Sequence, residues 1–454
     1  MPGTAADEPR PEGRSARGWA AVALGLAVVG LVATVWRPVA PALPPGIPEQ
    51  AWFDPGLLAT LDRYRSPRLW LAPVVTSLSV LVPVLVALWP RTARFTAVIT
   101  RDRLRAPWRG GVVAAAIGFL TWLVTLPLVA WVGLVHEGRW GFRTSSGAGW
   151  LRDQLVVAGG RWLALGLGVA ALLAARDRWP VSWPYRLTVA ATGAAVVLVV
   201  VHPVLIQPLL LRTEPLPPGP TREVVADVLT AAGHEGAPVL VADASRRTTR
   251  VNALITGLGP TERVILYDTL LELPDAQIAA VVAHELAHRE HADVLRGTAL
   301  TAVAALAAAL VVRRVLDGRA GRRTGARTPG DPRLVPLLVA VAAVLELLGT
   351  PVGGAVSRRV EAAADHRALE LGADPGELVR TVRTFVVRDL ADPTPATPFV
   401  VLYGTHPSPE QRLRAAAAAA DVRGSTLPTL EELQRDERAI RHPRAPRPGQ
   451  GGGP

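Results

Sequence analysis

The chain has 454 residues, of which 50% are hydrophobic, and its mean hydropathy is +0.28. This composition favours a membrane protein with soluble segments over two or three soluble domains. Cysteine is absent, which excludes disulfides and thiolate metal sites. The net charge of +11 comes from arginine. Arginine-rich loops beside membrane helices explain that excess, and no basic patch interleaved with aromatic residues indicates a nucleic-acid partner.

Seven apolar runs approach or reach the length of about 20 residues that a helix needs to cross a bilayer. They lie at 18–36, 69–89, 111–135, 155–175, 187–211, 297–312 and 334–356. No clean cleavage site follows the first run, so we expect a retained helix rather than a signal peptide. The sixth run is short and alanine-rich, and a buried helix of a soluble domain is the alternative for it.

These runs divide the chain into membrane and soluble segments. The predicted segments are a disordered N-terminus (1–17), an N-terminal membrane region of five helices (18–211), a soluble insertion (212–295), two further spans (296–356), a helical C-terminal part (357–440) and a disordered tail (441–454). Within the insertion, the pattern predicts a helix at 221–233 and strands at 238–243, 250–257 and 263–270. The fold class is therefore mainly α, a polytopic membrane protein that carries a small α+β domain. His136, just after the third run, is predicted to lie on the surface.

The motif VVAHELAHREHAD, residues 281–293, holds three of the nine histidines within eight residues. We expect it on a helix that starts at Pro274 and Asp275. Positions four apart share a helix face, so His284 and His288 can reach one metal ion. Glu285 lies beside them, placed to take a proton from water. This His-Glu-x-x-His arrangement is typical of zinc proteases, but it also arises by chance, so a third ligand is needed to support it.

A catalytic zinc has three protein ligands and an open fourth position. Because cysteine is absent, the third ligand must be histidine, aspartate or glutamate. His291 is near in sequence but lies at the end of the predicted helix. Glu361 is the better candidate, in a second helical motif, SRRVEAAADHRAL (357–369). Asp365 shares its face and could accept a hydrogen bond from the outer nitrogen of a ligand histidine. An ordinary solvated carboxylate is the alternative for Glu361.

The two motifs together resemble those of the type I CAAX prenyl endopeptidase family of membrane zinc metallopeptidases. The second motif of that family is Ser-Arg-x-x-Glu-x-x-Ala-Asp. Three more stretches are similar to the family in consistent order, so that the resemblance covers about residues 200–415. They are PVLIQPLLLRTEPLPPG at 203–219, VADASRRTTRVNALITGLGPTERVILYDTLLE at 241–272 and THPSPEQRL at 405–413. The first four runs agree with the family in number and hydropathy only.

The resemblance implies a zinc-dependent metalloendopeptidase with one Zn²⁺ per chain. The zinc would be bound by His284, His288 and Glu361, and Glu285 would be the general base. The family also encloses a water-filled chamber within seven helices, with the zinc site capping it. We therefore expect about seven transmembrane helices around a chamber, together with a small zinc-metallopeptidase domain.

The resemblance also assigns residues beyond the metal. His406 and Arg412 are similar to family residues that face the active site, near the substrate backbone or the developing oxyanion. A helix-capping residue before Pro407 is the other interpretation of His406. Asn252 matches the Asn-Ala pair of the family's substrate-side strand, whose edge could hold a peptide by strand addition.

The implied substrate is a peptide or a membrane protein, and the implied location is the cell membrane, which the chain crosses several times. A quality-control protease of the HtpX type, with fewer spans, is one alternative. A non-catalytic membrane scaffold or a transporter is another. The intact Glu285 argues against a scaffold, and the lack of paired, broken helices argues against a transporter.

Charge predicts the orientation of the site in the membrane. The loops 90–110 and 313–333 together carry thirteen arginines, and the first contains a single acid, Asp102. Loops of this kind are cytoplasmic. With seven spans, the zinc site and the C-terminus then face outward, whereas the eukaryotic family members have a cytosolic catalytic side. Losing one span from the count would reverse the prediction.

Overall fold

The computed structural model describes residues 17–22, 24–25, 48–92 and 104–439. The first predicted span, 18–36, lies mostly outside these residues, as do the predicted disordered ends. Six described helices are long and apolar enough to cross a membrane, and each overlaps one of the last six predicted runs. They are α2 (Pro55–Leu88), α4 (Ala106–Ala130) with η2 (Trp131–His136) and α5 (Glu137–Arg139), α6 (Gly147–Arg178), α7 (Trp183–Val201) with η3 (His202–Ile206), α11 (Asp293–Leu316), and η7 (Pro332–Leu334) with α13 (Val335–Glu370). The alanine-rich sixth run is thus one of these long helices.

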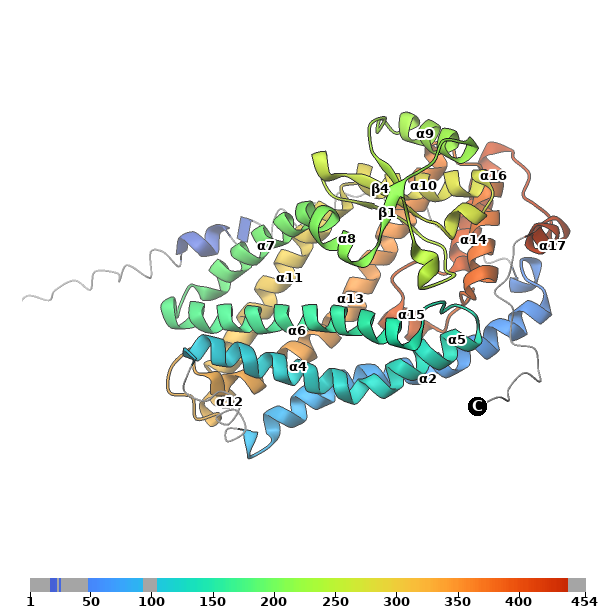
Figure 1. Ribbon diagram of the computed structural model, residues 1–454. Helices are drawn as coiled ribbons and strands as arrows, with labels where there is room; N and C mark the ends of the chain where they lie inside the picture. Colours follow the sequence, from blue (N-terminus) through green and yellow to red (C-terminus); the bar gives the residue numbers. More distant parts are fainter. Residues whose placement is uncertain (1–16, 23, 26–47, 93–103, 440–454) are drawn as a thin grey trace, which may run out of the picture.

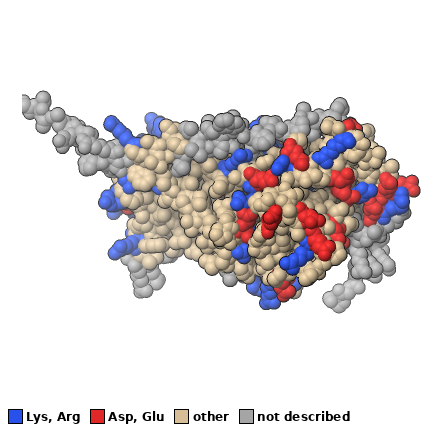
Figure 2. Space-filling view, turned by 90° about the horizontal axis from the view of Figure 1, so that it is seen from above, with Lys and Arg blue, Asp and Glu red and all other residues tan. Residues whose placement is uncertain are grey.

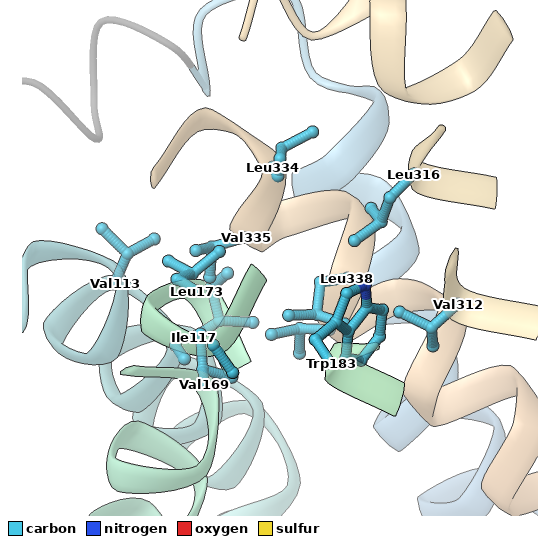
Figure 3. Packing of buried hydrophobic residues seen from close by; sticks show 13 residues of the cluster. Val113, Ile117, Val169, Leu173, Trp183, Val312, Leu316, Leu334, Val335 and Leu338 are labelled. Carbon is cyan, nitrogen blue, oxygen red and sulfur yellow. The ribbon is translucent and has the colours of Figure 1, made fainter. Parts of the chain in front are cut away.

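Small residues allow the spanning helices to pack closely. α4 and α6 lie side by side, and a Cβ atom on Gly111 would come within 2.6 Å of the carbonyl oxygen of Gly166. Such close backbone approach is how helices associate where lipid removes the hydrophobic driving force. Next to this contact, apolar side chains from five segments form one cluster (Figure 3). Its labelled members are Val113, Ile117, Val169, Leu173, Trp183, Val312, Leu316, Leu334, Val335 and Leu338.

Beyond this cluster lies an arginine-rich end of the bundle, which includes α12 (Arg319–Arg323). It carries Arg105, Arg109, Arg178, Arg313, Arg314, Arg319, Arg322, Arg323, Arg327 and Arg333. Figure 2 shows basic side chains at this end and almost all of the visible acidic ones at the other. The buried Arg176 bonds to Asp317 and to the carbonyl oxygen of Pro329, which fixes the α11–α13 connection against α6.

The opposite end carries a four-stranded sheet in the order β1-β2-β4-β3 (Figure 1). The strands are β1 (Thr213–Pro215), β2 (Val239–Ala242), β3 (Ala253–Thr256) and β4 (Arg263–Tyr267). β2 and β4 are parallel, and the other two pairs are antiparallel. Three of the four strands were predicted, and β1 was not. β3 lies at an edge of the sheet, and within the described part of the chain only β4 pairs with it.

Shorter helices lie at this end of the molecule. They are α8 (Gln207–Leu210), α9 (Pro220–Ala231), α10 (Asp275–Glu290), α14 (Pro375–Asp389), α15 (Thr397–Tyr403), α16 (Pro409–Arg423) and α17 (Leu430–Ala439), with short 3₁₀ turns η1 (Glu49–Ala51), η4 (Ala244–Arg246), η5 (Gly259–Thr261) and η6 (Leu270–Glu272). Of these helices, α9 and α10 bury apolar residues against the sheet. α10 joins the sheet core through Ile278, Val282 and Leu286, which recur every four residues on one helix face. Trp52 and Phe53, just before α2, are buried among residues of α14 and α16. This contact ties the first described span to the C-terminal helices.

The prediction that His136 is a surface residue is wrong. Its side chain is only 4% exposed, because the helix does not end with the apolar run but continues through η2 to Arg139. The imidazole stacks between the rings of Tyr64, at a centroid distance of 5.0 Å, and Trp131, at 5.6 Å.

Candidate metal centre

Two helices bring the candidate ligands together. His284 and His288 lie one turn apart on α10, and their Nε2 atoms are 3.3 Å apart. Glu361 comes from α13, which packs against α10, and its Oε2 atom lies 3.2 Å from Nε2 of His284 and 3.6 Å from Nε2 of His288. Among the residues that the structure describes, these three form the group able to hold a metal ion. His291, the other third ligand considered, is not part of it.

The donor atoms fit a four-coordinate zinc ion. Zinc bonds to nitrogen and oxygen at about 2.0–2.1 Å, which places neighbouring ligand atoms of a tetrahedron about 3.4 Å apart. The three observed separations, 3.2, 3.3 and 3.6 Å, bracket that value. Two imidazole nitrogens and one carboxylate also form a donor set that zinc prefers.

Carboxylates hold both histidines from the outer side. Asp365 lies 2.9 Å from Nδ1 of His284, and Asp293 lies 2.9 Å from Nδ1 of His288. Each Nδ1 therefore donates its proton to a carboxylate, which leaves the Nε2 lone pair for a metal. Asp365 is in turn held by Arg412, whose Nε and Nη2 donate to its two oxygens at 2.8 and 2.7 Å.

The position of Asp293 depends on a turn between two helices. α10 ends at Glu290 and α11 begins at Asp293. Between them, Ala292 adopts the left-handed conformation, with φ of 51°. That conformation is costly for a residue with a Cβ atom, and the sharp turn it makes brings Asp293 back onto His288.

The charges of the site favour a cation at its centre. Burial lowers the pKa of His284, but hydrogen bonds to Asp365 and Glu361 outweigh it and raise this pKa to about 8. In the same way, Asp293 and Glu361 overcome burial and raise the pKa of His288 to about 10. The surrounding carboxylates thus stabilise positive charge at the place where the two Nε2 atoms meet, and a divalent metal ion supplies that charge.

Glu285 lies beside the ligands and next to the edge of the sheet. Burial raises the pKa of its carboxyl group, while the neighbouring histidines and a hydrogen bond from the Ile255 backbone lower it. Ile255 belongs to β3, so the carboxyl group of Glu285 lies between the candidate ligands and the edge strand.

The remaining predicted site residues occupy three different environments. Nε2 of His406 lies 3.4 Å from Oε2 of Glu361, and its side chain is 61% exposed. Arg412 is largely buried and faces Asp365. Asn252 is exposed, directly before β3, and its carbonyl oxygen accepts a hydrogen bond of 3.0 Å from the Tyr267 backbone. His406 therefore lies near the ligands, Arg412 lies behind one of them, and Asn252 lies at the start of the edge strand.

Comparison with known proteins agrees with this geometry. Residues 216–420 match the family model described as peptidase family M48, and residues 51–212 match the one described as CAAX prenyl protease N-terminal, five membrane helices. The chain belongs to peptidase family M48. It is an integral-membrane metalloendopeptidase, and the metal cofactor that this family implies fits the group His284, His288 and Glu361.

Relatives of this M48 peptidase include bacterial and eukaryotic proteins. An uncharacterized metalloprotease, YhfN of Bacillus subtilis, is 28% identical over 66% of this chain and 71% of its own length. CAAX prenyl protease 1 of Saccharomyces cerevisiae is 29% identical over 37% of this chain and 38% of its own length. A protease HtpX homolog of Acidiphilium cryptum is 31% identical over 36% of this chain and 62% of its own length. The chain thus spans less than two thirds of the latter two relatives.

A solved structure shows the same fold. The crystal structure of S. mikatae Ste24p superposes with a TM-score of 0.72 at 18% identity, over 88% of this chain and 99% of the other. Together with the six long helices, this match shows a mainly helical, multi-pass membrane fold that carries a small mixed sheet.

Two residues of this M48 peptidase gain a structural setting that the motifs did not assign. Asp293, the last residue of the first motif, proves to be the partner of His288. Its place five residues after His288 was the available signal. Arg358, inside the second motif, was given no role, and it donates to two carbonyl oxygens at the end of α15.

Proposed function

We propose that this M48 peptidase of the cell membrane hydrolyses peptide bonds with one zinc ion, held by His284, His288 and Glu361. The observation that carries the proposal is the arrangement of three donor atoms 3.2–3.6 Å apart, with both histidine Nδ1 atoms already bound by carboxylates. Zinc at this place supplies Lewis acidity, which polarises a peptide carbonyl and acidifies water.

The residues around the zinc then move protons and hold charge. Glu285 accepts the proton of the attacking water and donates it to the leaving amine. Its partly buried setting, with a raised pKa, suits a group that must both accept and return a proton. Asp365 and Asp293 keep both imidazoles in the tautomer that binds metal.

The open edge of β3 supports a site for the peptide. Tyr267 N donates to Asn252 O, so the backbone groups of Asn252 point toward β4. In an antiparallel pair, the N–H and C=O groups of successive residues point alternately toward the partner strand and away from it. Ala253 and Ile255 therefore direct their backbone groups away from β4, on the side of Glu285. A substrate that adds as a strand there would pass directly beside the general base, with Asn252 at one end of the edge.

We assign different tasks to the two residues of the HPSPEQR motif. His406, exposed and 3.4 Å from Glu361, is placed to stabilise the oxygen that gains negative charge as the carbonyl is attacked. Arg412 donates to both oxygens of Asp365, so its task is to hold Asp365, and through it His284. In this proposal Arg412 does not meet the substrate.

The substrate class follows from the relatives only as a proposal. The match to the CAAX prenyl protease N-terminal model and the overlay on Ste24p favour peptide or membrane-protein substrates handled within a helical membrane body. An HtpX-like quality-control role is the second candidate, supported by the similarity to the HtpX homolog. Purified protein offered a prenylated peptide and an unfolded, unmodified protein, each with and without a chelator, would separate the two.

The general-base assignment has its own test. Glu285→Gln keeps the side-chain size and removes the basic group, so we expect cleavage to be lost while zinc content, measured by elemental analysis, stays at about one ion per chain. Cleavage by this variant at a rate close to that of the unaltered protein would show that another residue is the base.

A further inference from the structure

His406 is carried by a short connection whose two flanks are held differently. The connection runs from the end of α15 to Ser408, the N-cap of α16. On the α16 side, Ser408 and Gln411 form a reciprocal capping box, with hydrogen bonds of 3.2 and 3.0 Å. The imidazole itself contacts Thr405 Oγ1 at 3.0 Å, within the same connection. The capping box fixes the α16 side of His406, and its position over the ligands depends as well on what fixes the α15 side.

That side is fixed by Arg358. Its Nη1 atom donates to the carbonyl oxygens of Val400, at 3.0 Å, and Gly404, at 2.6 Å. The carbonyl oxygen of Val400 also accepts the N–H of Gly404 at 3.0 Å, so Arg358 adds a second donor to the closing turn of α15. Carbonyls at a helix C-terminus carry partial negative charge, which makes a guanidinium group a favourable cap. The hydroxyl of Tyr403 also donates to Thr76 of α2, at 3.3 Å, which ties the same turn to a spanning helix.

Gly354 shows that α15 must approach α13 closely at this point (Figure 1). A Cβ atom on Gly354 would lie 3.0 Å from the carbonyl oxygen of Gly404 and 3.1 Å from Nη1 of Arg358. Gly354 is one turn before Arg358, so the two share a face of α13. A glycine inside a helix costs up to about 1 kcal/mol relative to alanine, and here it leaves room for the carbonyl that Arg358 binds.

The same face of α13 continues into the metal site. Gly354, Arg358, Glu361 and Asp365 are spaced by four, three and four residues, which is one stripe along a helix. One rigid face thus holds the end of α15, one metal ligand and the partner of another. We infer that Arg358 is the positioning residue for His406: by binding the carbonyls of Val400 and Gly404 it sets the distance between His406 and Glu361. This inference rests on the role proposed above for His406.

The kinetic test is a double-mutant cycle on purified protein in detergent, with an internally quenched peptide that the unaltered protein cleaves. Arg358→Gln should lower kcat/KM roughly 10- to 100-fold, since displacements near 1 Å at an active site have effects of that size, while zinc content stays unchanged. When His406 is already replaced by alanine, adding Arg358→Gln should lower kcat/KM by less than about twofold. Arg359→Gln, the matched control at the exposed neighbouring position, should behave like the unaltered protein.

A second readout does not require activity. Because the chain contains no cysteine, Val401→Cys on α15 can carry a single nitroxide label. The label should become more mobile when Arg358→Gln is added and not when Arg359→Gln is added. If the unaltered protein cleaves no peptide, the proposed function fails, and label mobility still decides whether Arg358 fixes α15.

Three results would overturn the inference. The first is a normal kcat/KM for Arg358→Gln, and the second is a loss of kcat/KM on adding Arg358→Gln to His406→Ala that is as large as in the unaltered protein. The third is a label whose mobility does not change when Arg358→Gln is added. If Arg358→Gln does not insert into the membrane, Gly354→Ala takes its place. Gly354→Ala keeps the guanidinium group of Arg358 but pushes away the carbonyl of Gly404. The inference then requires that Gly354→Ala lower kcat/KM in the unaltered protein and leave it unchanged when His406 is already alanine.

Discussion

Replacing either outer carboxylate with asparagine should weaken zinc binding, and Asp365→Asn should weaken it more than Asp293→Asn. Each carboxylate lies 2.9 Å from Nδ1 of a ligand histidine. Loss of such a partner typically lowers metal affinity about 10- to 100-fold, or about 1.4–2.7 kcal/mol. Asp365 is 3% exposed and also accepts two hydrogen bonds from Arg412, so asparagine there leaves a buried guanidinium facing a neutral amide. We therefore expect a loss near 100-fold at Asp365 and near 10-fold at Asp293.

The assay is a zinc titration of metal-free purified protein in competition with a chelator of known affinity, at fixed pH. Asp153→Asn is a matched control, because Asp153 pairs with Arg247 at 2.8 Å, in contacts separate from those of the metal ligands. Its affinity should equal that of the unaltered protein. The reasoning is refuted if Asp365→Asn binds zinc as tightly as the unaltered protein, or if Asp293→Asn binds it more weakly than Asp365→Asn.

Three further outcomes are expected. Glu361→Ala should lower zinc content substantially, measured by elemental analysis, and unchanged content would move the third ligand elsewhere. Ala292→Gly should raise the free energy of unfolding by about 0.5–1 kcal/mol, because glycine tolerates the left-handed conformation, and an unchanged or lower denaturation midpoint would contradict this. To test the orientation of the protein in the membrane, a single cysteine is placed at Ala148 or at Thr328, and only one of the two should react with an impermeant thiol reagent on intact cells. Labelling at 148 but not at 328 is expected if the arginine-rich end is cytoplasmic, and the reverse pattern would place the metal site in the cytosol.

The structure sharpens that last test. Ala148, in the first turn of α6, lies at the same end as the metal site. The connection just before it is bound to the sheet segment, because Thr144 N donates to the carbonyl oxygen of Arg247, between β2 and β3, at 3.2 Å. Thr328 lies at the arginine-rich end, two residues before Gly330, whose N–H donates to Asp177 at 2.6 Å. The two labelling positions therefore report opposite ends of the bundle. This orientation stays a prediction, since it rests on the charge of the loops alone.

Sequence periodicity was sufficient where a function depends on one helix face. His284 and His288 are four apart on α10, and Glu361 and Asp365 are four apart on α13, so spacing alone predicted that the members of each pair share a helix face. The six later spans were equally visible, because apolar length is itself the signal for a membrane helix. The third ligand, by contrast, was chosen over His291 with the help of the family resemblance.

What could not be predicted depends on contacts between distant segments. Arg358 caps a helix that lies 42 residues further along the chain, and no local pattern reveals that pairing. Asp293 meets His288 only because Ala292 takes a left-handed conformation that alanine rarely adopts. His136 was placed on the surface because an apolar run ended before it, although the helix continues past it. β1 was missed because three residues, one of them proline, carry too little pattern to be recognised as a strand.

α13 is a single helix that begins at the arginine-rich end and still carries Glu361 in its last third. Its 36 residues make it roughly 54 Å long, at 1.5 Å per residue, and Glu361 lies about 39 Å from its start. A helix adjusts its tilt when the hydrocarbon thickness around it changes. Pivoting at the arginine-rich end by only about 2° moves Glu361 by more than about 1 Å, a displacement that matters to catalysis. The acyl-chain length of the surrounding lipid should therefore change the position of Glu361 relative to the two histidines. The same enzyme should turn over at different rates in thin and thick bilayers.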